Sequence, residues 1–335
     1  MMAPEEVEAF SERWRMAYAH RKDAEILDEL RRVVAENPGE ATFHFMLGCS
    51  LESLEEPEEA AVELRESVRL DPESAAAHYY LARALQGLEL YDEAHGHFRE
   101  ALRLRLRHEA LPGAPEIAGP RASVSRTTLC CVDCRNHELA IVALRRSMAQ
   151  CSFERVVFFT DRPFDLPGIE VVVIPAITSI AGYSRFMVQS LVDHVQTDFV
   201  LVIQYDGFIV NGRRWSAAFQ KYDYIGAPWT RGDVGNGGFS LRSRRLLEAL
   251  RDPRVVDLVP EDVAICVTYR RALESEYGIR FAPAELASQF SFESLPPPVP
   301  TFGFHGITHM IRIVDMSEEE LALYRPEPML NYTKS

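Results

Sequence analysis

Residues 199–207 read FVLVIQYDG, an apolar run that ends in a carboxylate and a glycine. The apolar part, 199–203, shows no alternation of polar and apolar residues, which is typical of a central strand covered on both faces by helices. Ligands of open α/β sheets bind beyond the carboxyl ends of the strands, so Asp206 is expected to point into a cleft. A turn formed by Asp206 and Gly207 without further function is the alternative interpretation.

A glycine-rich segment follows at residues 234–242, which read VGNGGFSLR. Its three glycines around Asn236 permit positive backbone dihedrals and close approach of a ligand to the main chain, and a strand pattern resumes after them. A hairpin turn would explain the glycines alone. It would not explain why Asp206, this loop, the pair Glu261-Asp262 and His305 follow one another in this order.

Strands and helices alternate ahead of these motifs. We expect a helix at 137–151 and strands at 127–132, 155–159 and 171–174. This alternation predicts an α/β domain with a mostly parallel sheet and right-handed crossovers. The chain has no GxGxxG after the first of these strands and no GxxxxGK[ST], which disfavours a dinucleotide-binding fold and a P-loop enzyme.

The motifs of this region together resemble the DUF5672 family of glycosyltransferase-like domains and, more loosely, the GT-A nucleotide-sugar transferases. The resemblance covers residues 127–309 and is carried by Gln-x-Asp at 204–206, YDYIGAPW at 222–229, VGNGGFSLR at 234–242, Pro-Glu-Asp-Val at 260–263, Phe-Ser-Phe-Glu at 290–293 and Gly-Phe-His-Gly at 303–306. It implies that residues 127–335 form a GT-A-like domain that transfers a sugar from a nucleotide-diphosphate sugar to an acceptor hydroxyl.

The resemblance also implies a divalent cation, Mn²⁺ or Mg²⁺, since GT-A enzymes commonly hold one with Asp-x-Asp. Here the matching stretch is Gln204-Tyr205-Asp206, so a single carboxylate remains. The implied metal ligands are Asp206 and His305, because a late histidine is a metal ligand in some GT-A enzymes. A hydrogen-bonded core histidine is the alternative interpretation of His305.

The acid pair after the glycine loop implies a catalytic base, as in inverting GT-A enzymes. Asp262 is the expected base, and Glu261 is the second candidate. Two acids in the first turn of a helix are also explained by the helix dipole without any function. A base must lie within roughly 3 Å of the acceptor hydroxyl.

The implied donor is a UDP- or GDP-sugar bound by residues from several segments. The candidates are Asp133, Thr160, Asp161, Arg185, Gln204, Tyr205, Trp229, Asn236, Gly237 and Gly238. Arg185 near a helix start suits a phosphate, and Trp229 suits the face of a sugar. A surface arginine and a core tryptophan are the alternatives.

Residues 1–110 carry a period of 34 residues, which becomes visible when Pro38 is laid over Pro72. The matching pairs include Ala41 with Ala75, Phe45 with Tyr79, Leu47 with Leu81, Ala60 with Ala94, Leu64 with Phe98 and Leu70 with Leu104. The period and pattern are those of tetratricopeptide (TPR) repeats, and residues 4–36 resemble a divergent first unit. A concave docking face for a peptide or protein and a packing support are equally open. A linker rich in proline and glycine is expected at 111–126.

Charge and composition narrow the function classes. The net charge is −14, and residues 1–110 contribute −11 of it through 24 acidic and 13 basic residues, which disfavours nucleic-acid binding. No apolar run approaches the length of a membrane span, and the acidic start does not match a secretory leader. The six cysteines form no paired framework, so we expect a cytoplasmic protein.

Two functions follow from the sequence. The first is an inverting, metal-assisted glycosyltransferase whose repeats dock the acceptor or a protein partner. The acceptor would be a glycan, a peptide or protein, or a small molecule. The second is a non-catalytic TPR scaffold with a degenerate nucleotide-sugar-binding domain. The lone Asp206 favours the second, whereas Glu261-Asp262 and His305 favour the first.

Overall fold

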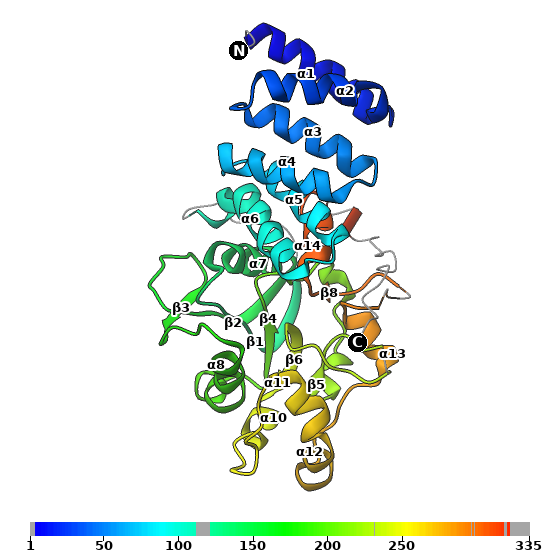
Figure 1. Cartoon of the computed structure of the whole chain (residues 1–335). Helices are drawn as coiled ribbons and strands as arrows, with labels where there is room; N and C mark the ends of the chain where they lie inside the picture. Colours follow the sequence, from blue (N-terminus) through cyan, green and yellow to red (C-terminus); the bar gives the residue numbers. More distant parts are fainter. Residues whose placement is uncertain are drawn as a thin grey trace. The chain divides into compact units, whose positions relative to one another are not determined.

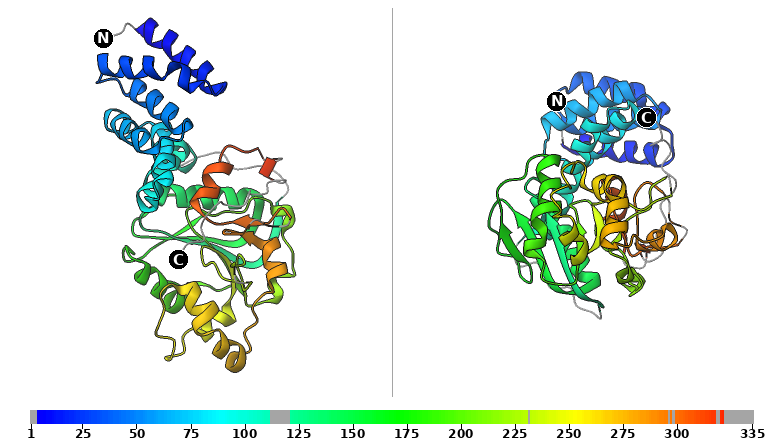
Figure 2. Two further views of the ribbon diagram at one scale, coloured as in Figure 1. Left: turned by 45° about the vertical axis from the view of Figure 1, so that its right-hand side comes forward. Right: turned by 90° about the horizontal axis from the view of Figure 1, so that it is seen from below.

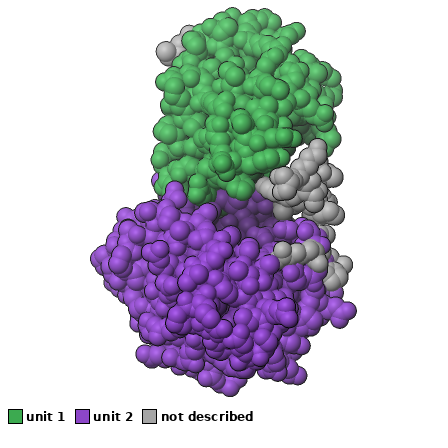
Figure 3. Space-filling model, turned by 60° about the horizontal axis from the view of Figure 1, so that its bottom comes forward, with its two compact units in different colours: residues 1–106 green, residues 107–335 purple. Residues whose placement is uncertain are grey.

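The computed structural model describes residues 4–111, 121–230, 232–295, 297, 299–317 and 320–321. The chain divides into two compact units, residues 1–106 and 107–335 (Figure 3). Most of the linker expected at 111–126 lies outside the described residues, and so do residues 322–335 of the expected second domain. Each unit is described below by itself.

The first unit is a series of antiparallel helices (Figure 1). The helices are α1 (Pro4–Ala19), α2 (Asp23–Glu36), α3 (Ala41–Ser53), α4 (Pro57–Leu70), α5 (Ala75–Gly87) and α6 (Tyr91–Ala110), which continues past the end of the unit. The turns inside the three hairpins each contain one non-glycine residue with positive φ, namely Arg21 at 54°, Glu55 at 61° and Glu89 at 61°. These residues are 34 positions apart, so α1 and α2 share the period despite their divergent sequence.

The repeat period extends to buried polar contacts. His44 and His78 occupy equivalent positions, and their Nε2 atoms lie 3.1 and 3.2 Å from the carbonyl oxygens of Pro38 and Pro72. The Nδ1 atom of His44 contacts Glu63 Oε2 at 2.7 Å, whereas that of His78 contacts Nδ1 of His97 at 2.9 Å. The two repeats therefore hold equivalent histidines in the same way, but the partner of Nδ1 is a carboxylate in one repeat and an imidazole in the other.

The second unit is built on a six-stranded sheet with the order β3-β2-β1-β4-β6-β5. The strands are β1 (Ala122–Val132), β2 (Cys151–Thr160), β3 (Glu170–Val173), β4 (Phe199–Ile203), β5 (Tyr224–Ile225) and β6 (Phe239–Ser243). Strands β1 to β4 are parallel, while β6 is antiparallel to both β4 and β5. The expected mostly parallel sheet is confirmed, and β1 begins at Ala122, ahead of the expected Thr127 and inside the expected linker.

Helices cover both faces of this sheet (Figure 2). They are α7 (His137–Gln150), α8 (Ile180–Arg185), α9 (Leu191–His194), α10 (Arg244–Ala249), α11 (Glu261–Val263), α12 (Arg270–Tyr277), α13 (Ala284–Phe290) and α14 (Ile307–Ile313). The π-helical segments Phe186–Ser190 and Ala264–Thr268 continue α8 and α11. A small parallel pair, β7 (Ser291–Phe292) and β8 (Gly303–Phe304), lies beside α13.

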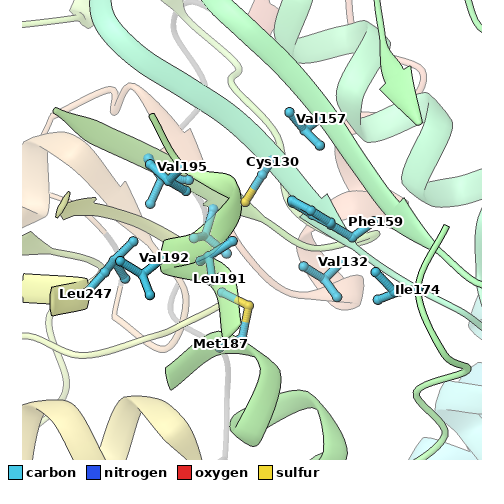
Figure 4. Close-up of a cluster of buried hydrophobic side chains, with 12 residues drawn as sticks. Cys130, Val132, Val157, Phe159, Ile174, Met187, Leu191, Val192, Val195 and Leu247 are labelled. Carbon is cyan, nitrogen blue, oxygen red and sulfur yellow. The ribbon is translucent and has the colours of Figure 1, made fainter. Parts of the chain in front are cut away.

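One face of the sheet packs on the π-helical segment Phe186–Ser190, on α9 and on α10 (Figure 4). Val200 and Val202 of β4 and Cys130 of β1 form one cluster there with Met187 and Leu191, and all are fully buried. Every residue of β4 is buried, which explains why its sequence lacks alternation.

Two helix glycines of the repeats predict opposite responses to alanine. A Cβ on Gly48 in α3 would lie 2.5 Å from Cγ of Leu64, whereas a Cβ on Gly96 in α6 would meet nothing within 4 Å. We expect Gly48→Ala to lower the free energy of unfolding by about 1–3 kcal/mol through overpacking. Gly96→Ala should raise it by roughly 0.5–1 kcal/mol, because alanine loses less backbone entropy in a helix. Urea unfolding followed by circular dichroism checks both, and shifts of the same sign would contradict this packing.

Candidate functional site

The glycine loop meets the end of β4 because β6 runs antiparallel to β4. Ile203 is paired with Phe239, so the residues after β4 and those before β6 lie at the same edge of the sheet. The backbone amide of Gln204 donates to the carbonyl oxygen of Gly238 at 2.9 Å. Asp206 and the loop 235–238 are thereby brought to the carboxyl end of a central strand, where open α/β sheets bind ligands.

The glycines of this loop are required by close packing. In the loop 235–238, Asn236 has a positive φ, at 60°, and the three glycines do not. A Cβ on Gly237 would lie 2.1 Å from Glu261 Oε1, and one on Gly238 would lie 2.1 Å from His305 Nε2. The expectation that the glycines supply positive dihedrals is therefore wrong. Side chains of the protein fill the space beside the main chain that the sequence suggested for a ligand.

His305 lies at the centre of a polar cluster. Its Nδ1 atom is 2.9 Å from Glu293 Oε1 and 3.2 Å from the side-chain nitrogen of Asn236. Its Nε2 atom is 3.0 Å from Gln204 Oε1 and 3.3 Å from Asp206 Oδ1. Both ring nitrogens thus face oxygen acceptors, which favours the doubly protonated imidazolium.

The charges around His305 outweigh the effect of its burial. Burial alone favours the neutral ring, but the carboxylates of Asp206 and Glu293 raise the pKa of His305 well above its ordinary value. Burial acts against ionisation of Glu293 as well, and its contact with His305 leaves the pKa of that carboxyl below the usual range. We therefore interpret His305 as a cation between two anions.

Glu261 and Asp262 have different surroundings. Glu261 is buried, and its Oε1 accepts from Nη2 of Arg242 at 3.0 Å. Burial raises the pKa of Glu261, and the Arg242 guanidinium opposes that rise. Asp262 is half-buried, and its Oδ2 accepts from the amide of Gly237 at 3.2 Å. Of the two acids, Asp262 is the one without a paired cation among the described salt bridges.

Sequence reasoning missed two members of this group. Glu293 closes the Phe-Ser-Phe-Glu motif and Arg242 ends VGNGGFSLR, but neither was among the predicted site residues. Arg242 is fully buried, and its Nη1 atom has no hydrogen-bond partner among the described residues. The position of both residues inside the quoted motifs was the available signal.

The structure brings together eight of the predicted site residues. They are Gln204, Asp206, Asn236, Gly237, Gly238, Glu261, Asp262 and His305. Tyr205 lies between two of them in the chain, and its side chain is half-buried. Trp229 contacts the group indirectly, because its ring packs on Gly235 at the start of the glycine loop.

The other predicted donor residues form separate contacts at the same sheet edge. Asp133 follows β1 and accepts from the backbone amides of Arg135 and Asn136 at 2.6 and 2.5 Å. Asp161 follows Thr160 at the end of β2, and its Oδ1 contacts Nε2 of His137 at 2.7 Å. No described hydrogen bond joins these groups to His305. Arg185 is exposed and has no polar contact with the described residues.

Of the two predicted metal ligands, only Asp206 fits that role. Among the described residues, no three His, Cys, Asp or Glu side chains are arranged to hold a metal. His305 does not fit as a ligand while both of its nitrogens face acceptors. Asp206 Oδ1 is buried and accepts no hydrogen bond among the described residues, but it lies 3.3 Å from Nε2 of His305, so a metal ion at Asp206 would share the carboxylate with that ring. Mg²⁺ is commonly held by one or two carboxylates together with substrate phosphates, and that pattern suits a lone Asp206.

The buried Arg242–Glu261 pair predicts a large effect of one substitution. Glu261→Gln leaves the guanidinium buried without its counter-charge, so we expect a loss of about 3–5 kcal/mol in unfolding free energy. Glu248→Gln is the matched control, since the Arg244–Glu248 pair has similar geometry at 2.9 Å but is exposed, and it should lose less than about 1 kcal/mol. Urea unfolding followed by the fluorescence of Trp215 and Trp229 measures both. Equal losses in the two variants would contradict the interpretation.

No described helix is both long enough and apolar enough to cross a membrane.

Comparison with curated proteins finds no match to this chain. Three solved structures are among those that match parts of this chain. A mutant of MamA is 24% identical with a TM-score of 0.27, over 30% of this chain and 74% of that one. The TPR domain of Arabidopsis OM64 is 22% identical with a TM-score of 0.28, over 30% of this chain and 83% of that one.

The third is an O-GlcNAc transferase mutant from Thermobaculum terrenum. It is 17% identical with a TM-score of 0.25, and the match covers 61% of this chain but less than half, 46%, of the transferase. Part of the chain also matches a family model. Residues 168–305 match the family described as a protein of unknown function, DUF5672, and this span contains Asp206, Asp262 and His305.

Proposed function

We propose that this chain is an inverting glycosyltransferase that uses a nucleotide-diphosphate sugar. The observation that carries the proposal is that Asp262 and His305 both contact the loop 236–238 at the carboxyl edge of the sheet, and that Asp206 contacts His305 there. A nucleotide would bind at the exits of β1 and β2, where Asp133 and Asp161 lie. The coarse similarity to a glycosyltransferase is compatible with this assignment and does not carry it.

Asp262 is the proposed base. It would accept the proton of the acceptor hydroxyl while that oxygen attacks the anomeric carbon of the donor. The bond from that carbon to the diphosphate breaks, and its electron pair leaves with the diphosphate, so attack from the opposite side inverts the configuration. Glu261 is unsuited to this role because it is buried and paired with Arg242.

Asp206 would meet the diphosphate side of the donor. Asp206 would hold a divalent cation, which would supply positive charge to offset the departing diphosphate. His305 would position Asp206 through its charge and would hold Glu293 on its other side. The cluster of His305, Asp206 and Glu293 has a net charge of about −1 when all three are ionised, which disfavours a bare diphosphate.

The helical repeats would dock the acceptor or a protein partner. Aromatic rings follow one another along α1, α3 and α5, where the ring centre of the buried Trp14 lies 5.9 Å from that of Phe45, and the ring centre of Phe45 lies 5.6 Å from that of Tyr80. Phe45 and Tyr80 are half-buried. The guanidinium of Arg83 lies 5.6 Å from the ring centre of Tyr80. Aromatic rings and arginine are enriched in the centres of protein interfaces, which supports a docking role.

Donor binding should depend on a cation that the protein does not hold alone. In thermal unfolding with a panel of UDP- and GDP-sugars, we expect Mn²⁺ without donor to give no shift. Mn²⁺ should strengthen binding of the correct donor at least tenfold, about 1.4 kcal/mol, and Asp206→Asn should remove that gain. Asp257→Asn, at an exposed acid, is the control. No response to any donor would instead favour a non-catalytic binding protein.

Asp262→Asn tests the base. The substitution preserves shape and an oxygen for the amide of Gly237 but cannot take a proton, so we expect kcat to fall by about 10²–10⁴. Donor affinity should stay nearly unchanged in the same variant. Turnover measured with the preferred donor decides the matter, and full activity would remove Asp262 from the mechanism.

A further inference from the structure

A cavity of about 250 Å³ lies beside the candidate site. Its walls come from the hairpin between β5 and β6, from α13 and from β7, and include Trp229, Thr230, Ser288, Ser291, Phe292 and Pro297. The cavity is smaller than the ~300–1,000 Å³ of pockets for drug-sized ligands, so it suits a single ring. Neither the proposed base nor the proposed cation site accounts for it.

Trp229 forms one wall and is fixed by a glycine. A Cβ on Gly235 would lie 2.0–2.3 Å from three atoms of the six-membered ring of Trp229, so the indole lies flat on the main chain there. The ring is half-buried and lines the cavity. Flat apolar rings such as indole bind the apolar face of a sugar or another ring.

Ser291 supplies an unused polar group. The residue lines the cavity and is fully buried, and its Oγ has no hydrogen-bond partner among the described residues. Leaving a buried hydroxyl unpaired is unfavourable, and native structures usually satisfy such groups with protein, water or ligand. The hydroxyls of Ser288 and Thr230 are further polar groups in the same walls.

Two residues of the cavity wall, Phe292 and Trp229, contact segments of the candidate site. Phe292 lines the cavity, and its carbonyl oxygen accepts from the amide of His305 at 3.0 Å. Gly235, which supports Trp229, lies two residues before Gly237, which contacts Glu261 and Asp262. A ring held in the cavity would therefore contact Trp229 and Phe292, the residues that connect the cavity to the glycine loop and to His305.

We propose that this cavity binds a pyranose ring of the acceptor. The assignment rests on the proposed transfer reaction and specifies its acceptor as a glycan. The indole would take the apolar face of the ring, and the hydroxyl side chains of Ser291, Ser288 and Thr230 would meet its hydroxyl groups. An aromatic ligand would use the same indole but would leave the Ser291 hydroxyl unpaired.

Filling the cavity tests the assignment. Ser288→Phe places a phenyl group in the cavity, and Glu285→Phe places one on the exposed side of the same helix, outside the cavity. With methyl β-D-glucopyranoside and N-acetylglucosamine as probes in saturation-transfer NMR, we expect binding to the wild type and to Glu285→Phe. Ser288→Phe should bind at least tenfold more weakly. Absence of pyranoside binding to the wild type, equal binding by both variants, or binding of phenol in place of pyranosides overturns the proposal.

A second variant tests the unpaired hydroxyl. Ser291→Ala removes a buried group without a partner, so we expect a higher Tm without sugar and several-fold weaker binding of the pyranoside. A lower Tm with unchanged sugar binding would overturn this role of Ser291.

Donor binding separates this proposal from the one on which it rests. Thermal shift with nucleotide sugars should be the same for Ser288→Phe and the wild type. Loss of donor binding in Ser288→Phe would assign the cavity to the donor and overturn the acceptor assignment. Absence of donor binding to the wild type would contradict the transfer reaction, whereas pyranoside binding that Ser288→Phe abolishes would still locate a sugar in the cavity.

Discussion

The antiparallel pairing of β6 with β4 is the constraint on which the candidate site depends. The pairing runs from Phe199 with Ser243 to Ile203 with Phe239. A slip of one residue would turn every side chain of β6 to the opposite face of the sheet and would remove Arg242 from Glu261. The register also places the loop before β6 beside Gln204 and Asp206, and His305 then packs on that loop.

Charge compensation sets the arrangement within the site. Burying an isolated charge is very unfavourable, so buried ions occur in pairs with additional hydrogen bonds. Arg242 meets Glu261 and also bonds the hydroxyl of Ser240 at 3.0 Å. His305 lies between Asp206 and Glu293. Both ion groups contact the main chain at glycines, since a side chain at Gly237 or Gly238 would exclude them.

The sequence predicts much of the fold because its strands and repeats have simple periods. The unbroken apolar run of β4 and the 34-residue period of the helices are patterns of single segments, and both are found in the structure. Contacts between distant segments are not visible in such patterns. The role of Glu293 depends on His305, and the difference between Glu261 and Asp262 depends on Arg242, which becomes a partner only through the sheet register. The start of β1 at Ala122 was missed because a strand edge with polar residues resembles a linker.

The paired histidines of the repeats make one hairpin sensitive to acid. His44 faces the carboxylate of Glu63, whereas His78 faces the imidazole of His97. Burial and the nearby His78 lower the pKa of His97. At a pH below the ordinary pKa of histidine, His97 therefore binds a proton more readily in the unfolded chain than in the folded chain. The free energy of unfolding thus falls as the pH falls from that ordinary pKa to the lower pKa of the folded state. Acidification should thus weaken the hairpin of α5 and α6, where His78 and His97 meet.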